Sequence, residues 1–75
     1  MEIYLIVIED RHNDVVVLPR RDKRFAIEEA RGIAGFRASQ HNYEINTDNP
    51  YTTALYFAQY SCEGDCVYVV DAELK

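Results

Sequence analysis

The segment IYLIVI, from Ile3 to Ile8, is the feature that most restricts how this chain can fold. Its apolar and mostly β-branched residues occupy both alternating faces of the expected strand. A strand that is apolar on both faces is usually central in its sheet. Because 75 residues are too few for two hydrophobic cores, we expect one domain, residues 1–75, with this strand inside its sheet.

Three further segments have the composition and alternation of strands. Residues 15–19, VVVLP, are a β-branched run that ends at Pro19 and follows the polar loop 9–14. Residues 52–61 and 66–74 each alternate between two faces and are joined through the short segment CEGD. We therefore expect two β-hairpins, one near each end of the chain.

Between the hairpins, residues 20–36 change to a helical period. Asp22 is a good N-cap, and the apolar stripe consists of Ala26, Ile27, Ala30, Ile33 and Ala34. Two ends of the helix remain possible. Gly35 could terminate it as a C-cap residue, or the helix could continue to about Ser39, with Gly32 and Gly35 packing closely on the sheet.

The resulting order, ββαββ, predicts an α+β fold in two layers, with one helix on a four-stranded antiparallel sheet. The order of the strands in the sheet stays open. One helix covers only one face of such a sheet, so alternate residues of each strand lie on the other. By alternation these could include four tyrosines, which would either form a docking surface or lie in part under the helix and shield the strands: Tyr4, Tyr56, Tyr60 and Tyr68.

The net charge of −5 is distributed unevenly along the chain. Residues 1–37 contain seven acidic and seven basic residues, whereas residues 38–74 contain six acidic residues and no base. Only Lys75 opposes this second group. An acidic excess favours solubility, and it also fits a surface that meets a basic partner.

The two cysteines lie in SCEGDC, residues 61–66, and their geometry depends on the hairpin loop. A three-residue loop, Glu63 to Asp65, would place Cys62 opposite Cys66, where a disulfide could form. A two-residue loop, at Gly64–Asp65 or Glu63–Gly64, would place them on opposite faces. A zinc site lacks ligands and a redox site lacks a helix start, so we expect two small, reduced thiols that are buried or half-buried.

Other polar segments have simple structural interpretations. The loop EDRHND could offer carboxylates and His12 to a metal or to acid–base chemistry, but a solvated hairpin turn needs no such role. The basic segment RRDKR, residues 20–24, is most simply a solvated helix start rather than a phosphate or nucleic-acid site. We therefore expect no catalytic residues, metal or cofactor, and no direct contact with nucleic acid.

The cellular compartment is predicted from the absence of a membrane-spanning apolar run and of signal-peptide features. No apolar run approaches the roughly 18 residues that a membrane span requires. The N-terminus, MEIYLIVIED, has neither a basic start nor a small-residue cleavage site. We therefore expect a cytoplasmic protein without a membrane partner.

Three stretches carry a resemblance to a known group of proteins: EDRHND after the first strand, AIEEAR in the helix, and YSCEGDCVYVVDAEL at the end. The chain resembles short uncharacterised proteins encoded by bacteriophages and actinobacteria, except in the loop 40–52. The resemblance implies a small α+β fold and the setting of a mobile element, and for a phage protein the host cytoplasm. In that setting small acidic proteins often inhibit host defence complexes, as anti-CRISPR proteins do.

These observations predict a protein-binding module rather than an enzyme. Its acidic surface would occupy a basic nucleic-acid groove of a host complex. We expect the tyrosines of the long loop 39–51 to act as anchors and the acids of the second half to supply charge: Tyr43, Glu44, Asp48, Tyr51, Glu63, Asp65, Asp71 and Glu73. Two alternatives are a structural or regulatory homodimer that pairs through a sheet face or edge, and a metal-binding protein that uses His12 with Cys62 and Cys66.

Overall fold

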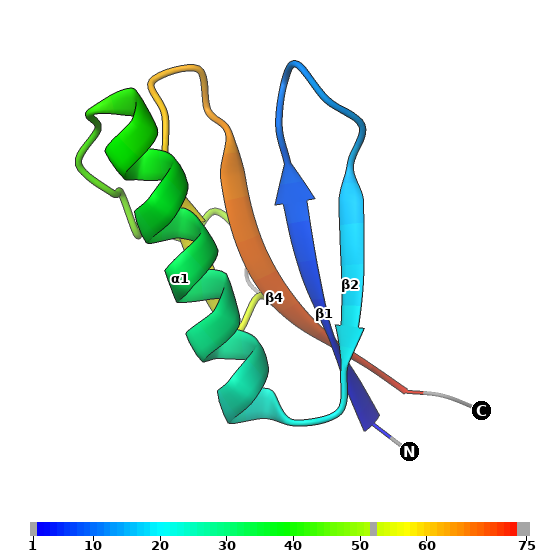
Figure 1. Ribbon diagram of the computed structural model, residues 1–75. Coiled ribbons are helices and arrows are strands. Elements are labelled where there is room, and N and C mark those ends of the chain that lie inside the picture. Colours follow the sequence, from blue (N-terminus) through cyan, green and yellow to red (C-terminus); the bar gives the residue numbers. More distant parts are fainter. Residues whose placement is uncertain (1, 52, 74–75) are drawn as a thin grey trace.

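The computed structural model describes residues 2–51 and 53–73 and confirms the α+β fold (Figure 1). Its elements are β1 (Glu2–Glu9), β2 (Val16–Arg20), α1 (Lys23–His41), β3 (Tyr56–Gln59) and β4 (Cys66–Glu73). The expected strand ends at Thr52 and Leu74, and the base Lys75, lie outside the described residues. β3 begins later than predicted, because residues 53–55 belong to the preceding loop.

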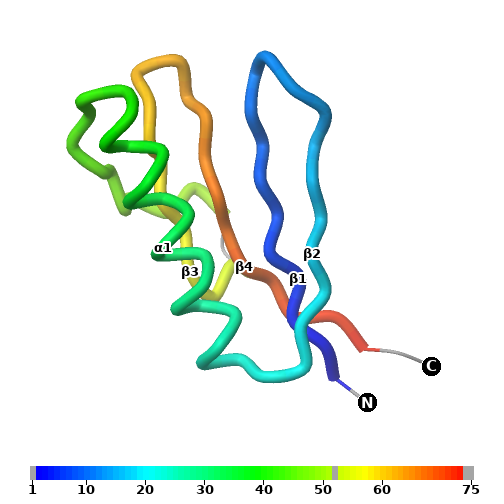
Figure 2. Tube along the Cα trace, in the orientation of Figure 1, coloured from blue at the N-terminus to red at the C-terminus, as the bar shows by residue number. Residues whose placement is uncertain are grey.

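The sheet is antiparallel throughout, with the order β2-β1-β4-β3. β1 is central, as its two apolar faces predicted. It pairs with β4 along its whole length, from Glu2 opposite Glu73 to Glu9 opposite Cys66. β2 and β3 are therefore the two edge strands, and β3 lies beside β4 (Figure 2).

The helix begins where the sequence predicted and ends later. The Asp22 carboxylate accepts a hydrogen bond of 2.8 Å from the backbone N–H of Phe25, which is the expected N-cap. The helix continues to His41, and Asn42 closes it in the left-handed conformation, with φ of 51°. Neither Gly35 nor Ser39 ends it.

Alanine, not glycine, sets how closely the helix approaches the sheet. The buried residues of α1 are Ala26, Ala30, Ala34 and Ala38. Gly32 and Gly35 are exposed, and a Cβ atom at either position would meet nothing within 4 Å. The expectation that these glycines pack on the sheet is therefore wrong.

The core lies between α1 and one face of the sheet, which we call the helix side. It is formed by side chains of β1, β3, β4 and the residue after β3: Ile6, Ile8, Ala58, Tyr60, Val67 and Val69. Tyr4 and Tyr56 pack against the same cluster. Three of the four tyrosines expected on an exposed sheet face thus lie on the helix side, because α1 covers the even-numbered residues of β1 and β3.

The opposite face, which we call the far face, carries Tyr68 and is partly covered by the loop between α1 and β3. Tyr51 from this loop lies over Phe57 and Tyr68, with ring centroids 5.9 and 4.9 Å away. Phe57 and Cys66 are buried as a result. The long loop therefore has a structural role in covering a sheet face.

The hairpin between β3 and β4 has a longer loop than either alternative considered from sequence. Tyr60 donates its backbone N–H to the Asp65 carbonyl at 2.9 Å, which leaves the four residues 61–64 as the loop. Gly64 has a φ of 91°, where a side chain would be strained. Cys66 is buried, and the two thiols are not bridged. Cys62 is exposed because it lies in the loop, so the expectation that both thiols are at least half-buried is wrong for Cys62.

Candidate functional site

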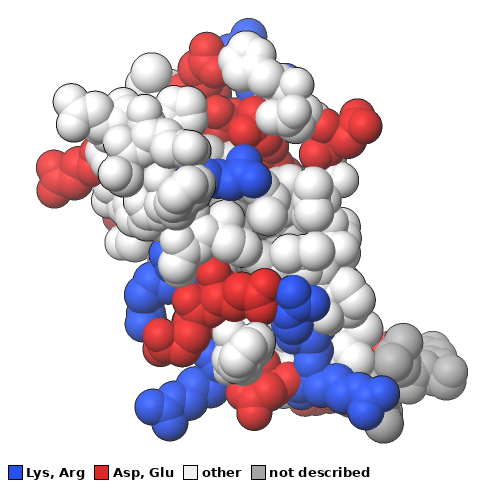
Figure 3. All heavy atoms as spheres, viewed as in Figure 1, with Lys and Arg blue, Asp and Glu red and all other residues white. Residues whose placement is uncertain are grey.

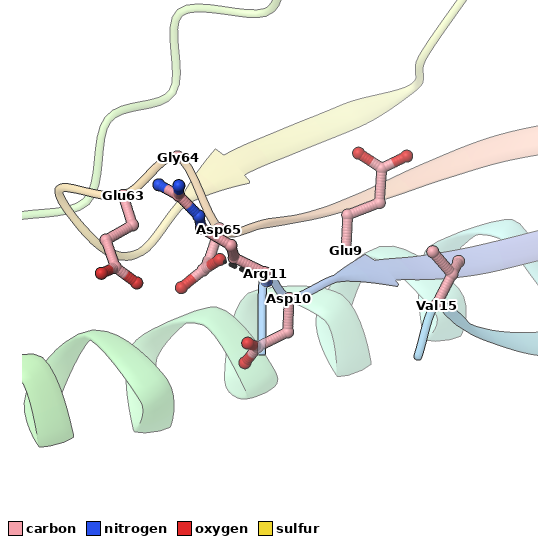
Figure 4. A pocket seen from close by; sticks show the side chains of 7 residues that line it. All are labelled: Glu9, Asp10, Arg11, Val15, Glu63, Gly64 and Asp65. Atoms are coloured by element: carbon pink, nitrogen blue, oxygen red, sulfur yellow. Dashed lines mark hydrogen bonds between the residues drawn. The ribbon is translucent and has the colours of Figure 1, made fainter. Parts of the chain in front are cut away.

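The loops of the two hairpins meet at one end of the molecule, although they are far apart in the sequence (Figure 4). The Asp65 carboxylate accepts a hydrogen bond of 2.7 Å from the backbone N–H of Arg11. His12 Nε2 lies 2.7 Å from Glu63 Oε2. We call this region, residues 9–15 and 60–66, the hairpin tips.

Asp65 holds the hairpin tips together from inside. Its side chain is only 3% exposed, and its second carboxylate oxygen accepts a hydrogen bond of 2.8 Å from the Ser61 hydroxyl. With Arg11 on the first oxygen, both oxygens are used within the protein. The expectation that Asp65 adds charge to a docking surface therefore does not hold.

Asp10 connects the first hairpin to the helix and to the end of β3. Its carboxylate accepts hydrogen bonds from the His12 backbone at 2.9 Å and from Tyr60 and Arg37, each at 3.3 Å. The His12 hydrogen bond, with smaller contributions from Tyr60, Asn13 and Arg37, holds the Asp10 pKa below its usual value against the effect of burial. Asp10 therefore remains ionised and anchors the tip.

Tyr60 forms the buried centre of this contact. The Arg37 guanidinium lies 5.6 Å from the centre of its ring, a distance at which cation–π attraction operates. Burial raises the pKa of the Tyr60 hydroxyl, and Arg37 opposes that shift only in part. Tyr60 thus acts as a neutral hydrogen-bond donor that joins the core to the hairpin tips.

Glu9 points to the other side of β1 from Asp10 and forms a second polar contact (Figure 4). It accepts hydrogen bonds from Tyr68 at 2.9 Å and from the Cys66 thiol at 3.8 Å. Burial first, and then Glu9, raises the pKa of Cys66 to about 11 and that of Tyr68 to about 12. Cys66 is therefore a protonated thiol at neutral pH and a poor nucleophile.

An open hollow of about 450 Å³ lies between the hairpin tips. It is lined by residues of both tips: Glu9, Asp10, Arg11, Val15, Glu63, Gly64 and Asp65. Figure 4 shows that its acids point in different directions rather than toward one centre. Across residues 2–51 and 53–73, no three His, Cys, Asp or Glu side chains are arranged to hold a metal ion.

The loop residues expected to bind a partner have different environments. Tyr43 is half-buried, and its hydroxyl lies 3.4 Å from the side-chain nitrogen of Gln59, which donates to it. Tyr51 is 40% exposed at the edge of its packing on the far face. Glu44 and Asp48 are exposed. The tyrosines are therefore structural as well as accessible, while the two acids are free of packing constraints.

Asp71 and Glu73 lie at the end of β4 that is remote from the hairpin tips. They are exposed, and in the sheet they lie opposite Tyr4 and Glu2. The residues predicted as a partner-binding set therefore do not form one patch. They divide into the loop acids, Glu63 at the hairpin tips and the β4 end.

The contact among Asp10, Arg37 and Tyr60 was not predicted from the sequence. These residues are separated by 27 and 50 positions, and no local pattern connects them. The charge alternation of EDRHND and the late arginine of the helix gave the only signals. These signals indicated that charged residues were present, but they did not indicate which of them are in contact.

Comparisons with protein family models, curated proteins and solved structures find no match to this chain. Within the described part of the chain, no helix is both long and apolar enough to cross a membrane. The resemblance to phage and actinobacterial proteins thus stays a prediction from the sequence alone.

Proposed function

We propose that this chain is a protein-binding module that presents exposed acids of its second half to a basic partner. The observation that carries the proposal is the distribution of ion pairs. Three arginines of the first half pair with acids of the same half: Arg20 with Glu29, Arg31 with Glu28 and Arg37 with Asp10, at 2.7, 3.1 and 3.3 Å. Three of the seven bases of the first half are therefore paired with acids of the same half.

The acids of the second half have a different environment. Glu44, Asp48, Asp71 and Glu73 are exposed, and none forms an ion pair with another described residue. Glu63 pairs only with His12. Figure 3 shows acidic and basic side chains mixed around the lower part of the helix side, where α1 begins. The unbalanced negative charge therefore belongs to the loop and strand ends of the second half.

The polar groups of the hairpin tips support binding rather than catalysis. Asp10, Asp65 and Glu9 each accept hydrogen bonds from within the protein, and Cys66 stays protonated. Such groups fix a surface in place without presenting an activated nucleophile or base. Binding of the exposed acids to a basic groove, which excludes nucleic acid from that groove, is the function we favour, in line with a phage-encoded inhibitor of a host defence complex.

The test combines capture, salt dependence and a matched pair of charge variants. The immobilised protein is exposed to bacterial lysate, the captured protein is identified and purified, and its affinity is measured at several salt concentrations. Glu44→Lys with Asp48→Lys should weaken binding by about tenfold or more, because complementary charges across an interface are lost. The control, Asp14→Lys with Glu28→Lys, changes the net charge equally at exposed acids of the first half and should weaken binding much less.

Two results would contradict the proposed function. One is a captured partner whose affinity does not change with salt. The other is an equal loss of affinity in both double variants, which would show that net charge and not position decides. Competition between the chain and a nucleic acid for the purified partner tests the inhibitory role separately.

A further inference from the structure

The outer edge of β2 exposes three consecutive valines, the first of them just before the strand. β2 pairs only with β1, and no strand among residues 2–51 and 53–73 lies on its other side. Val15, Val16 and Val17 are 59%, 41% and 49% exposed. An open edge with β-branched side chains is a template for pairing with another strand.

The two faces of β2 differ in a regular way. Val16, Leu18 and Arg20 lie opposite Ile8, Ile6 and Tyr4 and therefore face the helix side. Val17 and Pro19 lie opposite Val7 and Leu5 and face the far side. A partner strand must match both sets, and this requirement limits the registers in which a strand can add to the edge.

We propose that the strand which pairs with β2 is β2 of a second copy, antiparallel and centred on Val17. In this register Val16 lies opposite Leu18 on the helix side, and Val15 lies opposite Pro19 on the far side. Asp14, which precedes the strand, then lies opposite Arg20, which ends it. Each apolar residue meets an apolar residue, and the acid meets a base at both ends of the pair.

Other registers fit less well. A shift by two residues in one direction places Asp14 opposite Asp22, and in the other direction it places Asp14 opposite Leu18. A shift by one residue removes the contact between Asp14 and Arg20 in either direction, and it brings helix-side residues of one copy opposite far-side residues of the other. Like charges and charge–apolar pairs directly opposite each other destabilise a sheet, so charge complementarity selects the register centred on Val17.

The basic end of β2 is held in place for this contact. The Arg20 guanidinium donates hydrogen bonds of 2.7 and 2.8 Å to the two Glu29 oxygens. The same side chain donates to the Pro19 carbonyl at 2.8 Å and remains about one third exposed. Arg21 beside it is exposed and takes part in none of the ion pairs among the described residues. Asp14 is exposed at the other end.

Site-specific cross-linking tests both the dimer and its register. In a Cys62→Ser background, which removes the exposed native thiol, Val17→Cys should form a disulfide-linked dimer when oxidised glutathione is added. The two copies of residue 17 lie on the two-fold axis, where Cα atoms of opposed residues are about 4.5–5.5 Å apart, within the range for a disulfide. Leu55→Cys, exposed near β3, is the matched control and should stay monomeric on a non-reducing gel.

A mixing experiment fixes the register more sharply. Val16→Cys and Leu18→Cys should each remain uncross-linked alone and should form a disulfide-linked dimer when the two variants are mixed. Cross-linking of Val16→Cys alone, without cross-linking of Val17→Cys, would place the axis elsewhere and overturn the proposed register. Equal cross-linking of Val17→Cys and Leu55→Cys would overturn the interface.

Sedimentation of unmodified protein gives an independent test. The wild type should show a concentration-dependent dimer, and Val17→Pro should raise its dissociation constant by at least about tenfold, because proline removes the central backbone donor. Circular dichroism confirms that the variant is folded. A wild type that remains monomeric at millimolar concentration, on the order of 1 mM, would overturn the proposal.

Discussion

The two edge strands of the sheet differ in whether a loop covers their outer side. On β3, the backbone N–H of Asn46 donates to the Gln59 carbonyl at 3.1 Å, and Gln59 N–H donates back to Asn46 at 2.8 Å. On β2, no described residue pairs with the outer edge. The chain between α1 and β3 thus covers one edge and leaves the other open.

In this sheet, an edge strand is protected from further pairing by the connection that covers it and not by its own length. β3 is the shorter strand, with four residues against five in β2. Its protection comes from the long loop, which pairs through Asn46 and packs through Tyr51. The β1–β2 connection is short and turns away at the hairpin tips, so it cannot cover β2. An open, self-complementary edge fits a strand that pairs between molecules.

The same substitution on each edge should have the most unequal effect. Gln59→Pro removes the hydrogen bond to Asn46 from a covered strand and should lower the free energy of unfolding by about 2 kcal/mol, because the Asn46 carbonyl loses its donor. Val17→Pro should cost about 1 kcal/mol or less. Val17 and Pro19 are two residues apart on the strand, so their backbone nitrogens point the same way, and β2 already accommodates a proline nitrogen in that direction.

Urea titrations measure this difference at a protein concentration where sedimentation shows only monomer. Far-ultraviolet circular dichroism before titration shows whether each variant has the native strand and helix content. Equal losses in the two variants, or a larger loss for Val17→Pro, would mean that the outer edge of β2 is as constrained as that of β3. The comparison of the edges would then fail.

Acid should weaken the contact that joins the two hairpins. The hydrogen bond from His12, followed by those from Tyr60 and Asn13 and the charge of Arg37, holds the Asp10 pKa below its usual value of 3.8. A carboxyl with a lower pKa in the folded state stabilises the protein fully above its unfolded pKa. That contribution is lost as the pH falls through the folded value.

Asp10→Asn should therefore be less stable than wild type at pH 7, and the difference should shrink below about pH 4. Thermal unfolding across this pH range measures it. Asp14→Asn, on the same loop and exposed, is the control and should change stability little at any pH. A deficit in Asp10→Asn that stays constant down to pH 2 would show that shape, and not ionisation, holds the tips together.

The strands and the start of the helix were predictable because they depend on local chemistry. The two apolar faces of residues 3–8 indicated a central strand, and Asp22 indicated the N-cap. Alternation also separated each strand into two faces correctly. It could not say which face the helix covers, so both an exposed position and a position under the helix stayed open for Tyr4, Tyr56 and Tyr60, and the structure shows the second.

The remaining errors concern contacts between distant segments. Asp65 is of a residue type common in turns, and only its contacts with Arg11 and Ser61 show that it is buried. The helix continues past both glycines. A single exposed glycine costs only about 1 kcal/mol of stability relative to alanine, and this cost is less than the stabilisation from the packing of Ala38 and the Asn42 cap together. The candidate acids were identifiable from composition, but their division into separate groups depends on the sheet order.

The smallest predicted effect concerns the two thiols, which report on the covered side of the sheet. In native protein at pH 8, iodoacetamide should modify the exposed Cys62 quickly and Cys66 slowly, because burial raises the pKa of Cys66 to about 11. Tyr51 lies near Cys66 and Glu9 on the far face. Removing its ring should therefore loosen the cover over Cys66.

Tyr51→Ala should accelerate Cys66 modification about fivefold, since the lost aromatic contacts are worth about 1 kcal/mol. The Cys62 rate should not change, because Cys62 is already exposed. Val15→Ala, on the open edge, is the matched control and should leave both rates as in wild type. Mass spectrometry of peptides from timed samples separates the two cysteines. If Val15→Ala accelerated Cys66 as much as Tyr51→Ala does, the loop would not be what protects this side, because a change at the unprotected edge would then open it equally.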